Sequence, residues 1–122
     1  MKEEARVAIL KEATSQLLQL GFLARQRGYR YLREAILVAC QEPETITSVT
    51  KLLYPEVARR FNTTDKQVER AIRNSIETAW IKGNQDELNR MFGENYMRGD
   101  IRPTNTEVIA TLANYVDKEI SA

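Results

Sequence analysis

Apolar residues recur at intervals of three and four along most of the chain, which is the spacing of one helix face. The clearest run lies in the middle of the chain, where Val68, Ile72 and Ile76 repeat at this interval. Similar runs predict helices over residues 4–20, 29–41, 55–61, 64–82, 84–92 and 104–119, with a shorter segment over 46–53. No run alternates apolar and polar residues for long enough to predict a sheet. We therefore expect an all-α fold.

Capping residues and prolines indicate where these helices begin. Pro55 suits the first turn of a helix, because its missing N–H is not needed there. Thr64, Asn84 and Thr104 each precede a Glu or Gln by three positions, which is the pattern of a capping box, so they predict three helix starts. Residues 93–103 show no period and contain two glycines, so we expect a loop there.

The segment from about residue 55 to residue 82 predicts a helix-turn-helix, in which a polar turn at 62–64 joins a short helix to a longer one. Arg70 and Arg73 lie three residues apart on the polar face of the longer helix, so they point in similar directions. A major groove admits one helix, and guanidinium groups match the O6/N7 edge of guanine. The side chains that we expect to contact bases are Glu69, Arg70, Arg73 and Asn74.

Basic side chains gather around this motif, although the net charge of the whole chain is only +1. A local basic face can bind a polyanion where the total charge would not. Hydroxyl and N–H groups at a helix start also suit a phosphate. The phosphate contacts that we expect here are Arg59, Arg60, Asn62, Thr63, Thr64 and Lys66. Arg59 and Arg60 point about 100° apart on a helix, so we expect only one of them to face DNA.

Other functions find little support in the composition. The chain has no histidine and one cysteine, which excludes Ser-His-Asp and Cys-His catalysis and any His-ligated metal. No nucleophile–base pair, phosphate loop or ligand cluster is visible, so we expect no enzyme, no cofactor and no metal site. No apolar stretch is long enough to span a membrane, and no signal peptide is visible. A single cysteine cannot form a disulfide within the chain, which favours a cytoplasmic protein, and we expect Cys40 to be a small buried apolar residue.

Simpler interpretations of the same residues stay open at this point. Arg70 and Arg73 can belong to a solvated face, paired with Glu69 or Glu77 along the helix. The aromatic residues Trp80 and Tyr54 lie on apolar faces, so we expect them in the core. We expect Tyr29 and Tyr31 to pack between the second helix and the helix-turn-helix.

Longer motifs resemble those of one family. Residues 27–36 read RGYRYLREAI, which contains the signature G-Y-x-Y-L-R-E-A-I, and residues 46–64 read ITSVTKLLYPEVARRFNTT. The runs VERAIR at 68–73, IETAW at 76–80 and RPTNTE at 102–107 continue the pattern, together with Gly83-Asn84 and Phe92-Gly93. In combination these motifs are similar to the C-terminal effector domains of the stage-zero sporulation protein A family, from about Leu17 to the end of the last helix.

This resemblance implies an all-α domain of about six helices around a central helix-turn-helix, and it also implies a function. Family members bind double-stranded DNA at a short T-G-T-C-G-A-A element, often in tandem head-to-tail copies, and activate or repress transcription at the onset of sporulation. They also contact RNA polymerase sigma subunits. By position, Glu69, Arg70 and Arg73 match the base-reading residues, and Arg102 matches a basic position that reaches toward DNA. Asn74 stands where the family commonly has histidine, and Lys66-Gln67 replaces a more usual Ser-Arg pair. The tandem sites lead us to expect self-association on DNA, through the last helix.

We expect residues 1–122 to form a single domain, because this length suits one hydrophobic core. Full-length family members begin with a receiver domain, which 122 residues are too few to include. The chain is then either an excised effector domain or a natural stand-alone relative, without a phospho-switch of its own. An alternative function is a protein-interaction module that binds a sigma factor or another regulator without DNA, which the near-neutral charge would suit.

Overall fold

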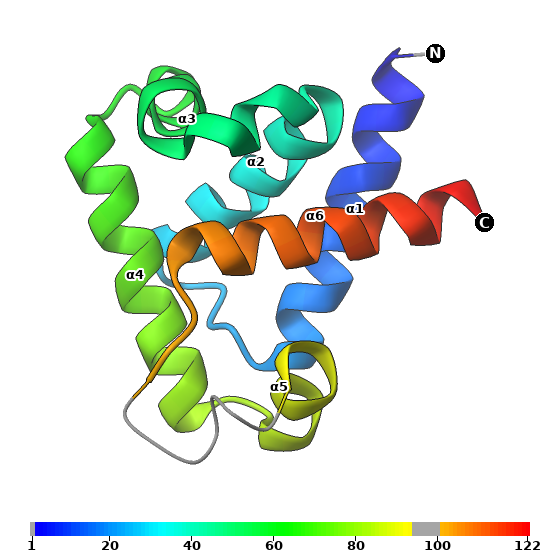
Figure 1. Cartoon of the computed structure of the whole chain (residues 1–122), viewed down its shortest axis with the longest axis vertical. Helices are drawn as coiled ribbons and strands as arrows, with labels where there is room; N and C mark the ends of the chain where they lie inside the picture. Colours follow the sequence, from blue (N-terminus) through cyan, green and yellow to red (C-terminus); the bar gives the residue numbers. More distant parts are fainter. Residues whose placement is uncertain (1, 94–100) are drawn as a thin grey trace.

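The computed structural model describes residues 2–93 and 101–122 of the chain. Within these two ranges the chain forms helices and no strand, so the all-α prediction is confirmed. The α-helices are α1 (Lys2–Leu20), α2 (Arg27–Gln41), α3 (Tyr54–Arg60), α4 (Asp65–Lys82), α5 (Gln85–Phe92) and α6 (Asn105–Ser121). Figure 1 shows α4 along one edge of the molecule and α6 crossing in front of α1 and α2.

The central element is α2, which packs against α1, α4 and α6. Its side chains Leu32, Ile36 and Leu37 are completely buried, as expected for a helix that has neighbours on several sides. Gly28 lies where the first turn of α2 crosses α4. A Cβ atom at this position would lie 2.1 Å from the carbonyl oxygen of Ala71, so glycine is what allows the two helices to approach. This crossing sets the position of α4.

The three predicted helix starts are confirmed by their hydrogen bonds. Thr64, Asn84 and Thr104 each accept a hydrogen bond from the backbone N–H three residues later, at 3.2, 3.2 and 3.1 Å. The capping box is complete at Thr104, whose own N–H donates to the Glu107 carboxylate at 2.8 Å. These caps satisfy N–H groups that would have no partner within the helix.

The segment between α2 and α3 differs from the single short helical segment that we expected at 46–53. A 3₁₀-helix covers Pro43–Ser48 and one π-helical turn covers Val49–Leu53. The hydroxyl groups of Thr45 and Thr47 donate to backbone carbonyls three residues earlier, at 2.7 and 2.6 Å. Such local bonds compete with regular α-helical pairing. Of the predicted loop at 93–103, residues 93 and 101–103 are non-helical, and 94–100 lie outside the described residues.

The predicted core positions of the aromatic residues are confirmed. Tyr29, Tyr31, Tyr54 and Trp80 are all buried. The ring of Tyr31, on α2, lies against the ring of Phe61 at the end of α3, with 5.1 Å between the centroids. This contact joins the second helix to the helix-turn-helix, as the sequence led us to expect.

Candidate nucleic-acid interface

The turn between α3 and α4 is a Schellman motif. Asn62 adopts a left-handed conformation with φ of 53°, which asparagine tolerates better than most residues. The Thr63 N–H donates to the Ala58 carbonyl at 2.9 Å, and the Asn62 N–H donates to the Arg59 carbonyl at 3.3 Å. These two bonds are the pair that defines this helix ending. The predicted helix-turn-helix is therefore present, and Asn62 has a structural role in its turn.

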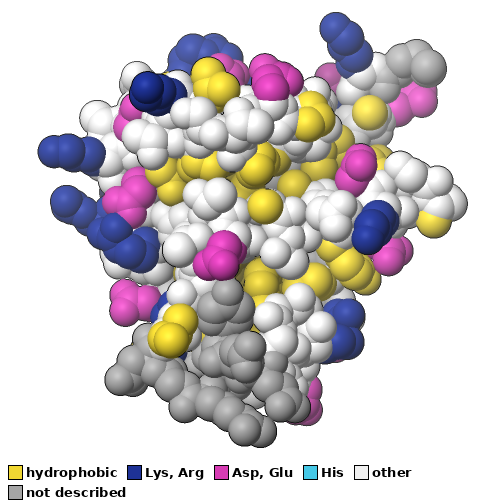
Figure 2. Space-filling model, viewed as in Figure 1, with side chains coloured by type: hydrophobic (Ala, Val, Ile, Leu, Met, Phe, Trp, Pro, Cys, Tyr) yellow, Lys and Arg dark blue, Asp and Glu magenta, His cyan; other side chains and the backbone are white. Residues whose placement is uncertain are grey.

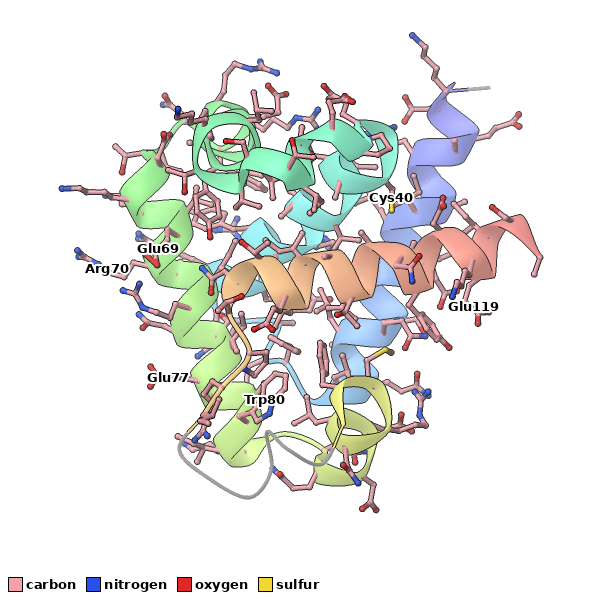
Figure 3. All side chains as sticks on the ribbon, viewed as in Figure 1. Cys40, Glu69, Arg70, Glu77, Trp80 and Glu119 are labelled. Atoms are coloured by element: carbon pink, nitrogen blue, oxygen red, sulfur yellow. The ribbon has the colours of Figure 1, made fainter. Side chains whose placement is uncertain are left out.

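The helix α4 has one buried face and one solvent face. The buried side chains are Val68, Ile72, Ser75, Ile76, Ala79 and Trp80. The opposite face is exposed and includes Lys66, Arg70, Arg73, Asn74 and Glu77. Figure 2 shows Lys and Arg side chains gathered along this edge of the molecule, with acidic groups among them. In Figure 3 the Arg70 side chain extends from α4 away from the body of the domain.

Two of the expected base-reading residues form an ion pair along α4. The Arg73 guanidinium donates to the carboxylate of Glu69, one turn earlier. The Arg73 side chain is 54% exposed and that of Glu69 is 35% exposed. For Arg73 this is the pairing that the solvated-face interpretation expects. Arg70 differs, because no residue in the described part of the chain forms an ion pair or hydrogen bond with its guanidinium.

The start of α6 is tied to the helix-turn-helix by Asn105. Its side-chain amide donates to the Tyr54 hydroxyl in α3 at 3.1 Å and to the Glu69 carbonyl oxygen in α4 at 3.0 Å. Burial raises the pKa of Tyr54, while this hydrogen bond opposes the shift. Sequence reasoning identified Thr104 as a cap but missed Asn105, since nothing local indicates that it bridges three helices.

Two hollows flank the exposed face of α4. The larger, of about 530 Å³, separates α4 from the segment that enters α6, and Glu69, Arg73 and Arg102 line it. The smaller, of about 180 Å³, lies between α4 and the start of α2, and Arg70 and Asn74 line it. The structure thus separates the four expected base contacts into two pairs, one on each side of the helix. Arg70 and Arg73 therefore border different hollows, and the expectation that they point in similar directions was wrong.

The two adjacent arginines of α3 have different surroundings. Arg60 donates to the carboxylates of Glu34 in α2 and Glu56, at 2.7 and 2.8 Å, and its side chain is 26% exposed. Arg59 donates twice to Glu56, at 2.6 and 3.2 Å, and its side chain is 71% exposed. The hydrogen bonds from both arginines lower the pKa of Glu56. Arg60 therefore joins α3 to α2, while Arg59 is the more accessible cation.

The remaining polar residues expected at phosphates surround the start of α4. Thr64 and Lys66 are exposed there, with the Thr64 hydroxyl oxygen already accepting from a backbone N–H. The Thr63 hydroxyl donates to the side-chain oxygen of Gln67. The side-chain oxygen of Gln67 is therefore bonded to Thr63, so it does not complete a reciprocal capping box with Thr64. The start of α4 therefore has two hydroxyl groups beside it, from Thr63 and Thr64, and the ammonium group of Lys66.

The described residues give little support for a functional site of another kind. No group of three or more Cys, Asp or Glu side chains there could hold a metal ion. None of the helices described combines the length and apolar character needed to cross a membrane. Cys40 is half-buried, and its Sγ contacts the Ala113 carbonyl oxygen at 3.5 Å. Burial, with the Asp117 charge nearby, raises the pKa of this thiol to about 11.

A comparison with known families supports the resemblance. The family model described as sporulation initiation factor Spo0A C terminal matches residues 13–116. The matched range contains α2 to α5 complete, with the last eight residues of α1 and most of α6. The resemblance inferred from the motifs is therefore confirmed.

Proposed function

The chain belongs to the sporulation initiation factor Spo0A C-terminal family, whose members are DNA-binding regulatory domains, and we propose that it recognises a specific DNA sequence through α4. In this proposal the helix enters the major groove of a TGTCGAA-like element and controls transcription at the onset of sporulation. The observation that supports it most is the exposed face of α4, where Arg70 and Arg73 flank the helix axis beside a Schellman turn.

The base contacts that we propose follow from the chemistry of the side chains. Arg70 and Arg73 each present a planar guanidinium that fits the O6 and N7 acceptors of guanine. The Glu69 carboxylate can accept from a cytosine amino group, and the Asn74 amide can pair with adenine. Glu69 also holds Arg73 by their ion pair, so it orients one reader while reading a base itself.

The phosphate contacts that we propose lie around the ends of the same helices. Lys66, Arg59 and Arg102 supply positive charge, and Asn62, Thr63 and Thr64 add uncharged hydrogen-bonding groups. The ion pairs of Arg60 with Glu34 and Glu56 support a role in stability for this residue. Lys51, an exposed residue of the turn before α3, is a fourth candidate cation. These four cations alone would contribute about −3.6 to the slope of log K against log salt.

Self-association and polymerase contact complete the proposal. Tandem copies of the element would align neighbouring domains, and the exposed side chains of α6, such as Asn114 and Lys118, are available for contact between them. A sigma subunit of RNA polymerase is the protein partner that the family suggests. We expect the free chain to be monomeric at micromolar concentration, and sedimentation of a stable dimer would contradict this.

A band-shift titration tests the proposal. The chain is titrated against a duplex that carries TGTCGAA and against a scrambled duplex of the same composition. Two bidentate guanine contacts of about 1–3 kcal/mol each predict roughly thirtyfold or greater preference for the element. Equal affinity for both duplexes would contradict sequence recognition. Absence of binding to either, at low salt, would favour the interaction module that works without DNA.

A further inference from the structure

The arginine side chains differ in whether they have a partner within the domain, and those without one indicate a second group of DNA contacts. Carboxylates pair with Arg6, Arg59, Arg60, Arg73 and Arg90, and aromatic rings lie under Arg30 and Arg33. Across residues 2–93 and 101–122, only the guanidinium groups of Arg25, Arg27 and Arg70 form no hydrogen bond, ion pair or ring contact with another described residue. Unpaired guanidinium groups are the ones most available to an external anion.

Two of these three arginines share one hollow. Arg27, the first residue of α2, and Arg70, on α4, line the hollow of about 180 Å³ between the two helices. The side-chain amides of Gln67 and Asn74 line it as well. Gly28 makes the hollow possible, because its missing side chain lets the start of α2 approach the backbone of α4. Arg25 is exposed but does not line this hollow.

The position of Arg27 is unfavourable for the isolated domain. A cation in the first turn of a helix opposes the helix dipole, and the first turn of α2 contains no acidic residue to compensate. The Arg27 and Arg70 charges also repel each other across the hollow. An anion bound beside Arg27 would reduce both costs, because its negative charge is favourable at a helix start and weakens the repulsion between the two guanidinium groups.

We propose that this hollow receives a backbone phosphate of DNA, with Arg27 as its principal partner. The inference rests on the proposed function, since α4 in a major groove would have one strand along each of its sides. Arg102 lies on the α6 side of α4 and Arg27 on the α2 side, so each strand meets one arginine from outside the recognition helix. Arg70 remains the base reader between them.

The test compares Arg27→Ala with a matched control, Arg25→Ala, in salt titrations of the chain on TGTCGAA and scrambled duplexes. Both changes remove one exposed, unpaired guanidinium, so they alter the total charge equally. Loss of one neutralised phosphate should make the slope of log K against log salt less steep by about 0.9 in Arg27→Ala. Affinity for both duplexes should fall by the same factor, because a phosphate contact is blind to sequence.

The control variants define the opposite results. Arg25→Ala should keep the wild-type slope, and Arg27→Lys should retain it because the charge stays in place. A wild-type slope in Arg27→Ala, or an equal change in Arg25→Ala, would overturn the inference and leave the proposed function intact. Loss of affinity for TGTCGAA alone would make Arg27 a base contact and would also overturn it. Failure of the wild-type chain to bind either duplex would overturn the proposed function itself, and the inference with it.

Discussion

The guanidinium of Arg73 is ion-paired with the carboxylate of Glu69, one turn earlier on the exposed side of α4. The pair lies at the hollow that separates α4 from the start of α6. The backbone of Glu69 is fixed as well, because its carbonyl oxygen accepts from the Asn105 side chain. One proposed base contact, Arg73, is thus positioned by another, Glu69, and the backbone of Glu69 is held in turn by α6.

Replacing Glu69 by glutamine should reduce sequence discrimination. The change keeps the shape but removes the charge that orients Arg73, and it also removes a carboxylate that repels the phosphate backbone. We expect affinity for scrambled DNA to rise and the ratio of TGTCGAA to scrambled affinity to fall. Thermal stability should change little, because an exposed pair contributes about 0.2–1 kcal/mol.

The control for this change is Glu77→Gln, which removes one negative charge from the exposed face of the same helix. It should raise affinity for both duplexes alike. An unchanged ratio in Glu69→Gln, or the same loss of ratio in Glu77→Gln, would contradict a positioning role for Glu69.

Replacing Asn105 by alanine should destabilise the domain. The change removes hydrogen bonds to the Tyr54 hydroxyl and the Glu69 carbonyl, two groups on helices that pack near the core. The loss of these hydrogen bonds, one of them to the hydroxyl of the buried Tyr54, costs about 0.5–1.5 kcal/mol each, which denaturant unfolding measures. The matched control is Asn114→Ala, an exposed position on the same helix. Equal stability of the two variants would show that the hydrogen bonds of Asn105 do not contribute to the free energy of unfolding.

The two arginines of α3 should differ in how much they contribute to the salt dependence of DNA binding. Arg59→Ala should make the slope of log K against log salt less steep by about 0.9, the value for one phosphate. Arg60→Ala should change the slope less and unfold more easily, because Glu34 and Glu56 lose a shared partner. The reverse order of the two slopes would show that Arg60 leaves its carboxylates to contact DNA.

Alkylation of Cys40 should be slow in the native domain and should accelerate with pH. The thiolate is the reactive form, and burial with the nearby Asp117 raises the pKa of this thiol from 9.0 to about 11. At pH 8 the native rate should be roughly a hundredfold below that in denaturant, because each pKa unit changes the thiolate fraction tenfold. The native rate should keep rising until about pH 11.

The charge of Asp117 provides the control for this prediction. Asp117→Asn should lower the pKa of Cys40 part of the way and speed alkylation, while Asp86→Asn, on α5, should not. A native rate that stops rising with pH near 9 would contradict the raised pKa.

The sequence predicted those features of the fold that depend on residues close to one another along the chain. Helix faces follow the spacing of residues such as Val68 and Ile72, and helix starts follow caps such as Thr104, because both signals lie within one or two turns. The turn at Asn62 was predictable for the same reason. The exposed polar face of α4 could therefore be proposed from the sequence alone as the surface that contacts bases.

Contacts between distant segments could not be predicted in this way. Nothing near Arg60 in the sequence indicates that Glu34 pairs with it, and nothing near Asn105 indicates that it reaches Glu69. The hollow that Arg27 shares with Arg70 arises only from the crossing of α2 and α4 at Gly28. These features depend on how the helices pack, which short-range patterns do not specify.

Arg73→Ala provides the most direct measurement of the central claim that α4 reads base sequence. Its affinity for TGTCGAA and for scrambled duplexes is compared with that of Arg90→Ala, which removes a guanidinium paired with a glutamate on α5. We expect Arg73→Ala to lose about 1–3 kcal/mol of discrimination, the value of one bidentate guanine contact, and Arg90→Ala to keep the wild-type ratio. If affinity for both duplexes falls by the same factor in Arg73→Ala, this residue contacts only the backbone, and its assignment to base reading on α4 is wrong.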